Sequence, residues 1–406
     1  MASGLSAYDA VMHSRDRITY FARSTARSGG PPFGIKYDDR FFHIYAIGKT
    51  GTGKSTLLEA LITQDARSGD GFAFVDPHGD LVERLVNSGD IPNVTYLNVP
   101  DHTQPYGWNP LRHVATERRA LVAGGILEVF RTMWPEAWGV RMEHILRNAL
   151  LALLEQPSAT LPDILRLLRD KHFRRAVAGR VAHEPVRTYW TKEFRPVPEF
   201  IAPVENKVGA FLADPVVFRI LVEPKDPISF RRIMDEGRVL LVNLAKGQIG
   251  PDSARVLGGL LVTTIGLAAF SRADTPEDAR RPFFLFVDEF QEYTTLSIAS
   301  MLSELRKFRV GLVLAHQYLD QLTTDVRGAV LGNAGTVIAF RIGPEDARLF
   351  AGEFGPHITA RDLVGLPNHE VYLKLMIDGA VSPPFSARTI TNAEALAAQD
   401  AALARS

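Results

Sequence analysis

The residues with the clearest chemical signature lie at positions 48–55, which read GKTGTGKS. This run matches the phosphate-binding loop pattern G-x-x-x-x-G-K-[ST], in which glycines let the backbone wrap tightly and point N–H groups at phosphate oxygens. In such a loop Lys54 contacts the β- and γ-phosphates, and the Ser55 hydroxyl binds Mg²⁺. A chance match in a glycine-rich turn is the alternative, but an apolar run precedes the loop and helix-like sequence follows it. The predicted nucleotide-binding residues are Gly48, Thr50, Gly51, Thr52, Gly53, Lys54, Ser55 and Thr56.

A pair of acids follows a second apolar run, residues 283–289, which read FFLFVDE. A buried parallel strand delivers such acids to the carboxyl edge of its sheet, where a phosphate-binding loop also lies. We therefore expect Asp288 in the Mg²⁺ shell and Glu289 as the group that polarises the attacking water. The alternative is a strand that simply ends in solvated acids.

The second acid narrows the class of nucleotide-binding protein. Motor ATPases commonly need a base at that position, whereas small-molecule kinases and GTP switches do not. The guanine-reading pattern Asn/Thr-Lys-x-Asp is not found, because Asn206 and Lys207 are followed by Val-Gly. The predicted ligands are therefore ATP and Mg²⁺.

A strand-end amide is the third signal, since residues 311–317 read GLVLAHQ. A glutamine that ends a strand beside the acid pair can hydrogen-bond the γ-phosphate or its attacking water. Gln317 would then report hydrolysis to the rest of the fold. A glutamine bonded only to neighbouring backbone is the alternative.

A parallel sheet is needed to bring these strand ends together. Strand-like runs alternate with helix-like stretches in the first and last thirds of the chain, which predicts an α/β fold with a mostly parallel central sheet covered on both faces. Helix-period segments without strand alternation fill residues 112–235 and predict an all-helical insertion. Asp80 and Glu83 are expected to form a capping box at the start of a helix. The predicted strands lie at 43–48, 71–76, 93–99, 239–245, 283–290, 311–317, 336–342 and 370–377.

These patterns divide the chain into four parts. The sequence predicts an N-terminal arm at 1–40, an ATPase domain made of 41–111 and 236–392, an all-helical inserted domain at 112–235, and a C-terminal tail at 393–406.

Several motifs carry a family resemblance through their order and spacing. The runs GKTGTGKST, VDPHGDL, WNPL, VDEFQ, RKFRVGLVLAHQ and NAGTVIAFR resemble those of the type IV secretion coupling proteins, the conjugative DNA-transfer ATPases of the FtsK–HerA superfamily of hexameric DNA pumps. The resemblance covers about residues 40–390. It implies a RecA-like P-loop NTPase motor with an all-helical inserted domain, assembly as a hexameric ring, and DNA as the partner. A relaxase, a nucleoprotein or secretion-channel proteins are further partners that it implies.

The same resemblance implies an arginine that acts on the neighbouring subunit's ATP, eleven residues before the sensor glutamine. Arg306 stands at that position. A guanidinium supplied across a subunit interface stabilises γ-phosphate charge and makes hydrolysis depend on assembly. Arg341, at the end of the next strand, is the second candidate, and a surface salt bridge is the alternative for both. Asp76, in the DPHGD turn, is expected either to tune the Mg²⁺ site or to form the turn.

Contact with DNA requires a local basic patch, because 46 Lys and Arg balance 46 Asp and Glu and the formal net charge is zero. Residues 164–180, ILRLLRDKHFRRAVAGR, carry five Arg and one Lys against one Asp. This segment of the helical insertion is expected to attract phosphates. An ordinary solvated helix face is the alternative.

Three functions fit these observations. The leading one is an ATP-dependent DNA translocase that works as a ring and feeds DNA to a secretion channel or a partner. The second is an adaptor that recruits a relaxase or protein effector and uses ATP to switch its assembly state. The third is a soluble HerA-like DNA pump partnered with a nuclease.

No segment approaches the roughly 18 apolar residues that span a bilayer, and the longest candidate, residues 258–270, is expected to be a buried helix. The N-terminus lacks the apolar core of a signal peptide, and there is no cysteine, which excludes disulfides and thiolate chemistry. Many members of the resembling family carry an N-terminal transmembrane hairpin, which this sequence does not show. We therefore expect a cytoplasmic protein, or one recruited to the inner membrane by a partner.

Overall fold

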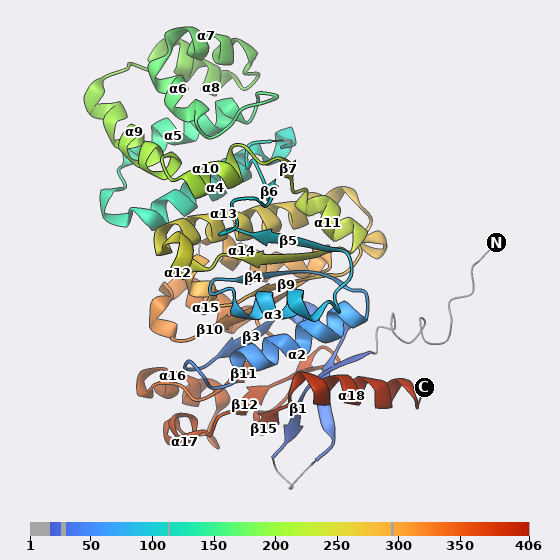
Figure 1. Cartoon of the computed structure of the whole chain (residues 1–406). Helices are drawn as coiled ribbons and strands as arrows, with labels where there is room; N and C mark the ends of the chain where they lie inside the picture. The colour runs from blue at the N-terminus through green and yellow to red at the C-terminus, as the bar shows by residue number, and fades with distance from the viewer. Residues whose placement is uncertain (1–16, 26–29, 113, 294–295, 406) are drawn as a thin grey trace, which may run out of the picture. The chain divides into compact units, whose positions relative to one another are not determined.

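The computed structural model describes residues 17–25, 30–112, 114–293 and 296–405. The chain forms two compact units (Figure 1). One unit consists of Met1–Tyr96, Arg231–Asn243 and Ala269–Ser406, and it contains the large sheet. The other consists of Leu97–Phe230 and Leu244–Ala268, and it is mainly helical.

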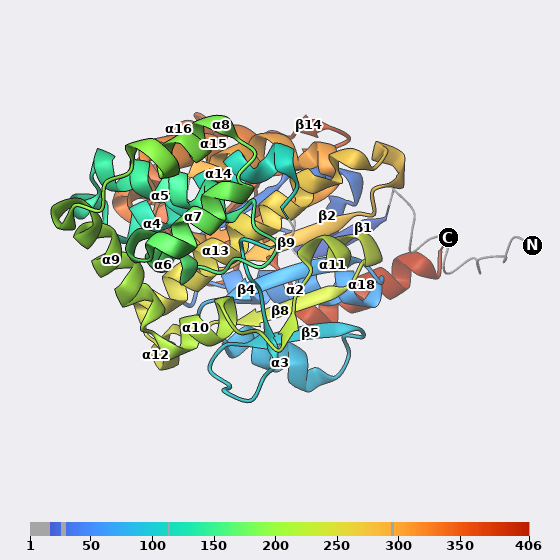
Figure 2. The same ribbon diagram turned by 90° about the horizontal axis from the view of Figure 1, so that it is seen from above.

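The first unit is built on an eleven-stranded sheet with the order β2-β1-β15-β12-β11-β3-β10-β9-β4-β8-β5. Strands β11, β3, β10, β9, β4 and β8 pair in parallel, and Figure 2 shows β9, β4 and β8 side by side. Strands β12, β15, β1 and β2 extend the sheet in antiparallel pairs beyond β11. The strands are β1 (Ile18–Ser24), β2 (Pro32–Lys36), β3 (Ile44–Ile47), β4 (Gly71–Asp76), β5 (Val94–Asn98), β8 (Val239–Asn243), β9 (Phe283–Val287), β10 (Val310–His316), β11 (Thr336–Ala339), β12 (Glu370–Lys374) and β15 (Phe385–Thr389).

The central strands are buried along their whole length, as their uninterrupted apolar sequences predict. Every residue of β3, β4, β9 and β10 is buried, which is the pattern of parallel strands covered on both faces. The predicted α/β fold with a mostly parallel sheet is confirmed. The helices of this unit include α2 (Lys54–Arg67), α3 (Asp80–Ser88), α11 (Phe230–Glu236), α14 (Leu296–Glu304), α15 (Thr324–Asn333), α16 (Pro344–Phe354), α17 (Ala360–Gly365) and α18 (Asn392–Leu403).

The two ends of the chain are more ordered than the sequence predicts. Within the expected arm, β1 and β2 form a hairpin at the edge of the sheet, and β1 pairs with β15 through registers such as Ala22↔Thr389. The prediction missed these strands because a partner more than 360 residues away supplies the pairing. The expected tail contains α18, which packs against α2 and β1 and begins with a capping box between Thr391 and Glu394. Residues 1–16 and 26–29 of the expected arm lie outside the described residues.

The helical unit begins and ends at different residues from the predicted insertion. It takes in residues 97–111 and 244–268, and it leaves residues 231–235, which belong to α11, in the sheet-containing unit. Its helices are α4 (Arg119–Met133), α5 (Val140–Leu153), α6 (Asp163–Arg169), α7 (Lys171–Arg180), α8 (Glu184–Thr188), α9 (Pro198–Leu212), α10 (Pro215–Leu221), α12 (Lys246–Ile249) and most of α13 (Pro251–Phe270).

Helix α13 explains why residues 244–268 join this unit. A Cβ added to Gly125 of α4 would lie 2.7 Å from the Thr263 methyl group of α13, so the two helices pack at close range. The apolar stretch that contains α13, Pro251–Asp274, is longer than expected and meets the length and hydropathy of a membrane-spanning helix. However, 72% of its most apolar window is buried inside the structure. This burial agrees with the expectation of a core helix.

Candidate nucleotide-binding site

The predicted phosphate-binding loop connects β3 to α2, as the motif requires (Figure 1). Gly51 and Gly53 have φ values of 75° and 120°, which residues with a Cβ rarely adopt. At Gly48 the restriction is space, because a Cβ there would lie 2.5 Å from the Cβ of Phe340. The Thr52 hydroxyl donates to the Lys49 carbonyl at 2.7 Å and closes the loop. The glycines are therefore needed for the shape of the loop.

Lys54 lies inside this loop and is nearly buried, with 6% of its surface exposed. Its ammonium donates to the carbonyl of Gly48 at 2.5 Å and to that of Lys49 at 3.3 Å. Burial lowers the pKa of Lys54, while the charges of Glu289 and Asp288 oppose that shift. The ammonium thus has no full anionic partner within hydrogen-bonding distance among the described residues, and it can exchange carbonyl oxygens for phosphate oxygens.

The acid pair lies at the carboxyl end of β9, between β4 and β10. Asp288 and Glu289 are 8% and 5% exposed, so the alternative of solvated acids does not hold. Burial, together with the charges of Glu289 and Asp76, raises the pKa of the Asp288 carboxyl to about 7, although Lys54 opposes this. A cation bound beside Asp288 would favour its ionised form.

The side chain of Glu289 connects the acid pair to the loop. The Gln317 amide donates to Oε1 of Glu289, and its own Oε1 accepts the Thr50 hydroxyl at 3.1 Å. Gln317 is therefore bonded to two side chains of the site rather than only to backbone. Gln291 donates to the other carboxylate oxygen of Glu289 at 2.7 Å, a contact that the sequence did not predict. Glu289 also has a left-handed φ of 47°, a backbone strain of the kind found at functional sites.

Asp76 forms the turn that follows β4. Its carboxylate accepts backbone N–H groups of His78 at 2.9 Å, Leu81 at 3.0 Å and Val82 at 3.2 Å. The predicted capping box of Asp80 and Glu83 is wrong, because no side chain caps α3 from Gly79 and Asp76 reaches its first N–H groups instead. The turn-forming alternative for Asp76 is thus the one that the contacts support.

Ser55 and Asp288 carry the oxygen donors that a Mg²⁺ site at this loop needs. Ser55 is exposed in the first turn of α2, and the following residue, Thr56, is half-buried. Within the described part of the chain, no group of three or more His, Asp or Glu side chains is placed to hold a metal. Mg²⁺ typically binds through one or two protein oxygens together with substrate phosphates, so Ser55 and Asp288 would be sufficient to hold it.

The two candidate arginines lie at opposite ends of the parallel strands, Arg341 at the carboxyl ends and Arg306 at the amino ends. The Arg341 carbonyl accepts the Lys49 N–H at 2.9 Å, so its backbone borders the loop, while its guanidinium donates to Leu366 O and Asn368 Oδ1. Arg306 precedes the amino end of β10, whereas Gln317 follows its carboxyl end. Neither guanidinium forms a salt bridge with a described carboxylate.

In the basic segment 164–180, three of the six cationic side chains contact other groups of the helical unit. Arg174 is buried and donates to the carbonyls that end α6. Arg166 is 3.9 Å from Asp170, and Arg169 is 2.6 Å from Glu205. The remaining cations, Lys171, Arg175 and Arg180, are exposed on α7.

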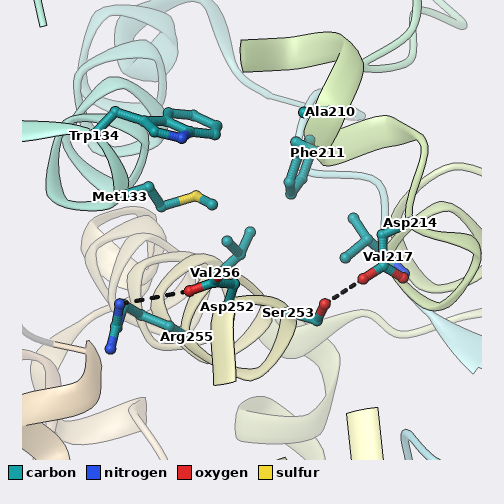
Figure 3. Close-up of a pocket in the computed structure, with 10 residues that line it drawn as sticks. All are labelled: Met133, Trp134, Ala210, Phe211, Asp214, Val217, Asp252, Ser253, Arg255 and Val256. Carbon is teal, nitrogen blue, oxygen red and sulfur yellow. Dashed lines mark hydrogen bonds and ion pairs between the residues drawn. The ribbon is translucent and has the colours of Figure 1, made fainter. Parts of the chain in front are cut away.

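A separate pocket of about 230 Å³ lies within the helical unit (Figure 3). Trp134, Met133 and Phe211 provide its apolar walls, and the Ser253 hydroxyl donates to the Asp214 carboxylate beside it. None of the predicted nucleotide-site residues lines this pocket.

Behind the site, His316 is fully buried at the end of β10, with the Tyr45 hydroxyl 2.8 Å from its Nδ1. Burial lowers the pKa of this imidazole to about 4, and Lys54 contributes in the same direction. An unfolded histidine titrates near 6.5. The folded state therefore loses stability as the pH falls from about 6.5 towards 4, because the unfolded chain binds the proton first.

This shift predicts a pH-dependent difference between wild type and His316→Gln. The advantage of the wild type over His316→Gln in free energy of unfolding should be largest above pH 6.5. It should fall by about 3 kcal/mol between pH 6.5 and 4. Urea unfolding at a series of pH values measures both curves. A difference that stays constant over this range would show that His316 is not held neutral by burial.

A glycine-rich loop between a parallel strand and a helix, with a buried acid pair and a glutamine at the ends of neighbouring strands, defines a P-loop protein with a RecA-like α/β fold. The profile of the family described as type IV secretion-system coupling protein DNA-binding domain matches residues 28–357. The chain belongs to this family.

Solved structures with the same fold include the plasmid coupling protein TrwB in complex with ADPNP, a non-hydrolysable ATP analogue. It is 18% identical, the match covers 96% of this chain and 93% of that one, and the TM-score is 0.66. TrwB in complex with ADP and Mg²⁺ gives the same identity and coverage with a TM-score of 0.65. VirB4 of Thermoanaerobacter pseudethanolicus is 12% identical over 94% of this chain and 99% of that one, with a TM-score of 0.63. No curated protein sequence matches significantly.

Proposed function

We propose that this protein is an ATP-dependent DNA translocase that hydrolyses ATP as a ring and moves DNA toward a secretion channel or a partner. The observation that carries the proposal is the chain of contacts from Thr50 through Gln317 to Glu289, which links the phosphate-binding loop to the acid pair. The family's description as a DNA-binding domain and the nucleotide complexes of TrwB support it. A cytoplasmic location, with recruitment to the inner membrane by a partner, is part of the same proposal.

Each side chain of the site has a separate role in ATP hydrolysis. Lys54 and the loop N–H groups would hold the phosphates, and Ser55 and Asp288 would hold Mg²⁺, which when bound would supply positive charge for the phosphate oxygens. Glu289 takes the position of the base that orients the attacking water. Gln317, which donates to Glu289 and accepts from Thr50, shifts its hydrogen bonds when the γ-phosphate leaves. This residue couples the nucleotide state to β10.

Arg306 is proposed to act on the neighbouring subunit's ATP. It lies before β10 and Gln317 lies after it, and seven strand residues at about 3.3 Å each separate the two ends by roughly 20 Å. The Arg306 guanidinium therefore cannot reach the nucleotide of its own subunit. A ring in which each subunit supplies this arginine to the next makes hydrolysis depend on assembly.

Mixing two inactive variants tests this arrangement. Arg306→Ala and Glu289→Gln subunits should each hydrolyse ATP poorly, and their mixture should regain activity. An Arg306→Ala site keeps its own Glu289 and receives Arg306 from the neighbour. Random assembly at equal concentrations places roughly a quarter of the sites in this productive arrangement. Steady-state hydrolysis of the mixture measures it, and a mixture no more active than the average of its components would show that Arg306 does not act in trans.

The proposal as a whole is tested by steady-state ATP hydrolysis over a series of protein concentrations, with and without double- and single-stranded DNA. DNA stimulation together with a steeper-than-linear concentration dependence is the result expected of an assembling DNA motor. A rate of ATP hydrolysis that neither form of DNA changes would favour the recruitment adaptor, which would act on a protein substrate instead. Variants of Lys171, Arg175 and Arg180 then test whether the exposed cations of α7 contact the DNA.

A further inference from the structure

The short helix that carries Arg306, η8 (Leu305–Phe308), is held on two sides. On one side the Arg306 guanidinium carbon lies 3.6 Å from the centre of the Phe42 ring, in a cation–π contact. Phe42 is itself fixed, because its carbonyl accepts the Gly335 N–H at 2.7 Å. A Cβ on Gly335 would lie 2.8 Å from the Cβ of Phe42, so the two backbones are close together.

On the other side two arginines bind the last carbonyls of η8. Arg280 donates to the Lys307 carbonyl, and Arg272 donates to that of Phe308 at 3.0 Å. The final carbonyls of a helix have no partner within the helix, and guanidinium donors satisfy them. These contacts therefore fix the backbone carbonyls of the two residues that follow Arg306.

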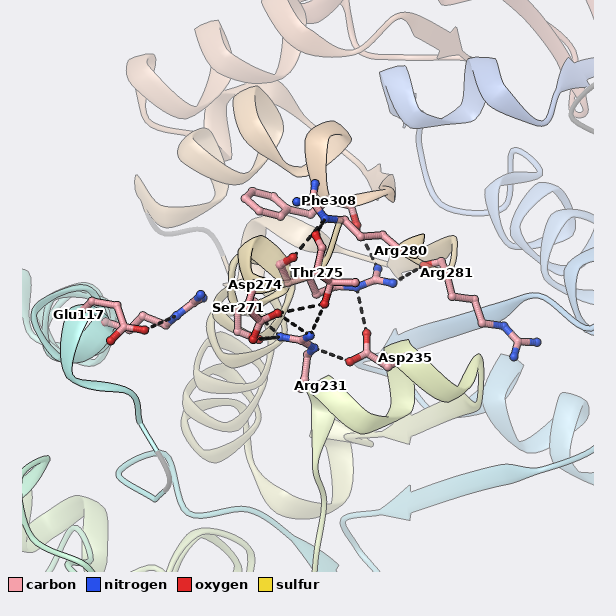
Figure 4. Close-up of polar contacts among 11 residues, drawn as sticks. Glu117, Arg231, Asp235, Ser271, Asp274, Thr275, Arg280, Arg281 and Phe308 are labelled. Atoms are coloured by element: carbon pink, nitrogen blue, oxygen red, sulfur yellow. Dashed lines mark hydrogen bonds and ion pairs between the residues drawn. The ribbon is translucent and has the colours of Figure 1, made fainter. Parts of the chain in front are cut away.

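The two arginines are anchored in turn by a polar network. Arg280 Nε donates to Arg272 O at 3.1 Å and to Thr275 O at 2.9 Å. The buried Arg272 has its Nε 3.1 Å from Asp235, which also accepts from Arg231. The network thus connects η8 to α11 and to η5 (Ser271–Asp274), and Figure 4 shows the labelled side chains from Phe308 to Arg231.

Carboxylates lie near Arg306 without pairing with it, since Asp38, Asp39 and Asp378 line the same cavity. Arg306 is exposed, and no described carboxylate pairs with it. The nearby Arg309 gives the contrast, since it stacks on Phe41 and also pairs with Asp38 at 3.1 Å. An aromatic ring restricts the rotamers of a guanidinium without neutralising it, which lowers the entropy lost when an anion binds.

We propose that Phe42 and Arg280 are positioning residues for Arg306. Phe42 orients the guanidinium, and Arg280 fixes the backbone of η8, so that Arg306 is preorganised for the phosphates bound by the next subunit. This inference rests on the proposed trans role of Arg306. It adds that the geometry is built within one subunit before the ring assembles.

A double-mutant cycle with Arg306→Ala tests the proposal by steady-state ATP hydrolysis of the full chain. Phe42→Leu should lower kcat about 2- to 5-fold, the range of a lost cation–π contact, with KM for ATP unchanged. Phe42→Tyr keeps the aromatic face and should retain the wild-type kcat. In the Arg306→Ala background neither Phe42→Leu nor Arg280→Ala should lower kcat further, because a positioning residue has no effect once its target is absent.

Phe200→Leu is the matched control, because Phe200 is a half-buried phenylalanine whose ring lies 3.9 Å from another guanidinium, that of Arg141. It should leave basal ATP hydrolysis unchanged. Additive losses in the cycle, or a higher kcat in Phe42→Leu, would overturn the positioning role. If the Arg306→Ala variant alone had the wild-type kcat, the proposed trans role of Arg306 would be wrong.

Discussion

Replacing Lys54 with alanine is expected to abolish ATP hydrolysis and to weaken binding of a non-hydrolysable ATP analogue by at least about 100-fold. Among the described residues, the hydrogen-bond partners of the Lys54 ammonium are two backbone carbonyls, at 2.5 and 3.3 Å, so it is available to phosphate oxygens. Loss of this group removes the positive charge placed closest to the β- and γ-phosphates. Isothermal titration with the analogue and steady-state turnover measure the two effects.

Lys54→Met separates this loss of function from a loss of structure. Methionine matches the length of the lysine stem, and burial lowers the pKa of Lys54, which means that the folded protein holds this charge at a cost. The thermal midpoint of Lys54→Met without nucleotide should therefore equal or exceed that of the wild type. Near-normal turnover in Lys54→Met would show that phosphate binding lies elsewhere.

The arrangement of the candidate nucleotide site was predictable because its residues lie at the ends of apolar runs. Parallel strands have their carboxyl ends at one edge of a sheet, so Asp288 and Gln317 were expected beside the loop that follows β3. The register confirms this placement, since β3 lies directly beside β10 and β9 directly beyond it. The contact of Gln291 with Glu289 was not predicted, because it depends on the short helical turn after the acid pair.

The edges of the fold were less predictable, for a physical reason. Strand β1 pairs with β15 and packs against helix α18, so its partners lie almost the whole length of the chain away. Local sequence carries little sign of such long-range pairing. A T-x-x-E capping signal does precede α18 at Thr391, and it was the one local indication that the tail is ordered.

The role proposed for Arg306 also could not be predicted from the local sequence. Its spacing from Gln317 identified it only through a family resemblance. Phe42, Arg272 and Arg280, which hold its segment, are far from it in sequence and match no motif. Side chains that act through another residue are recognised only when the contacts are seen.

Glu289→Gln is expected to lower kcat by about 10²- to 10⁴-fold, the usual contribution of a general base, while the affinity for ATP stays close to that of the wild type. The carboxylate accepts hydrogen bonds from Gln291 and Gln317, so the positions of both of its oxygens are fixed. Glutamine keeps the size of the side chain but cannot accept a proton from water. Single-turnover hydrolysis and nucleotide titration measure the two quantities.

Glu292→Gln is the control, because this acid lies in the turn after β9 and its N–H donates to the Glu289 carbonyl at 2.9 Å, outside the carboxylate contacts. It should hydrolyse ATP at close to the wild-type rate. If Glu289→Gln turned over normally as well, the left-handed backbone and buried carboxylate of Glu289 would serve the fold alone. The base would then have to be another acid near the loop, and the candidates are Asp288 and Asp76, whose charges act on each other.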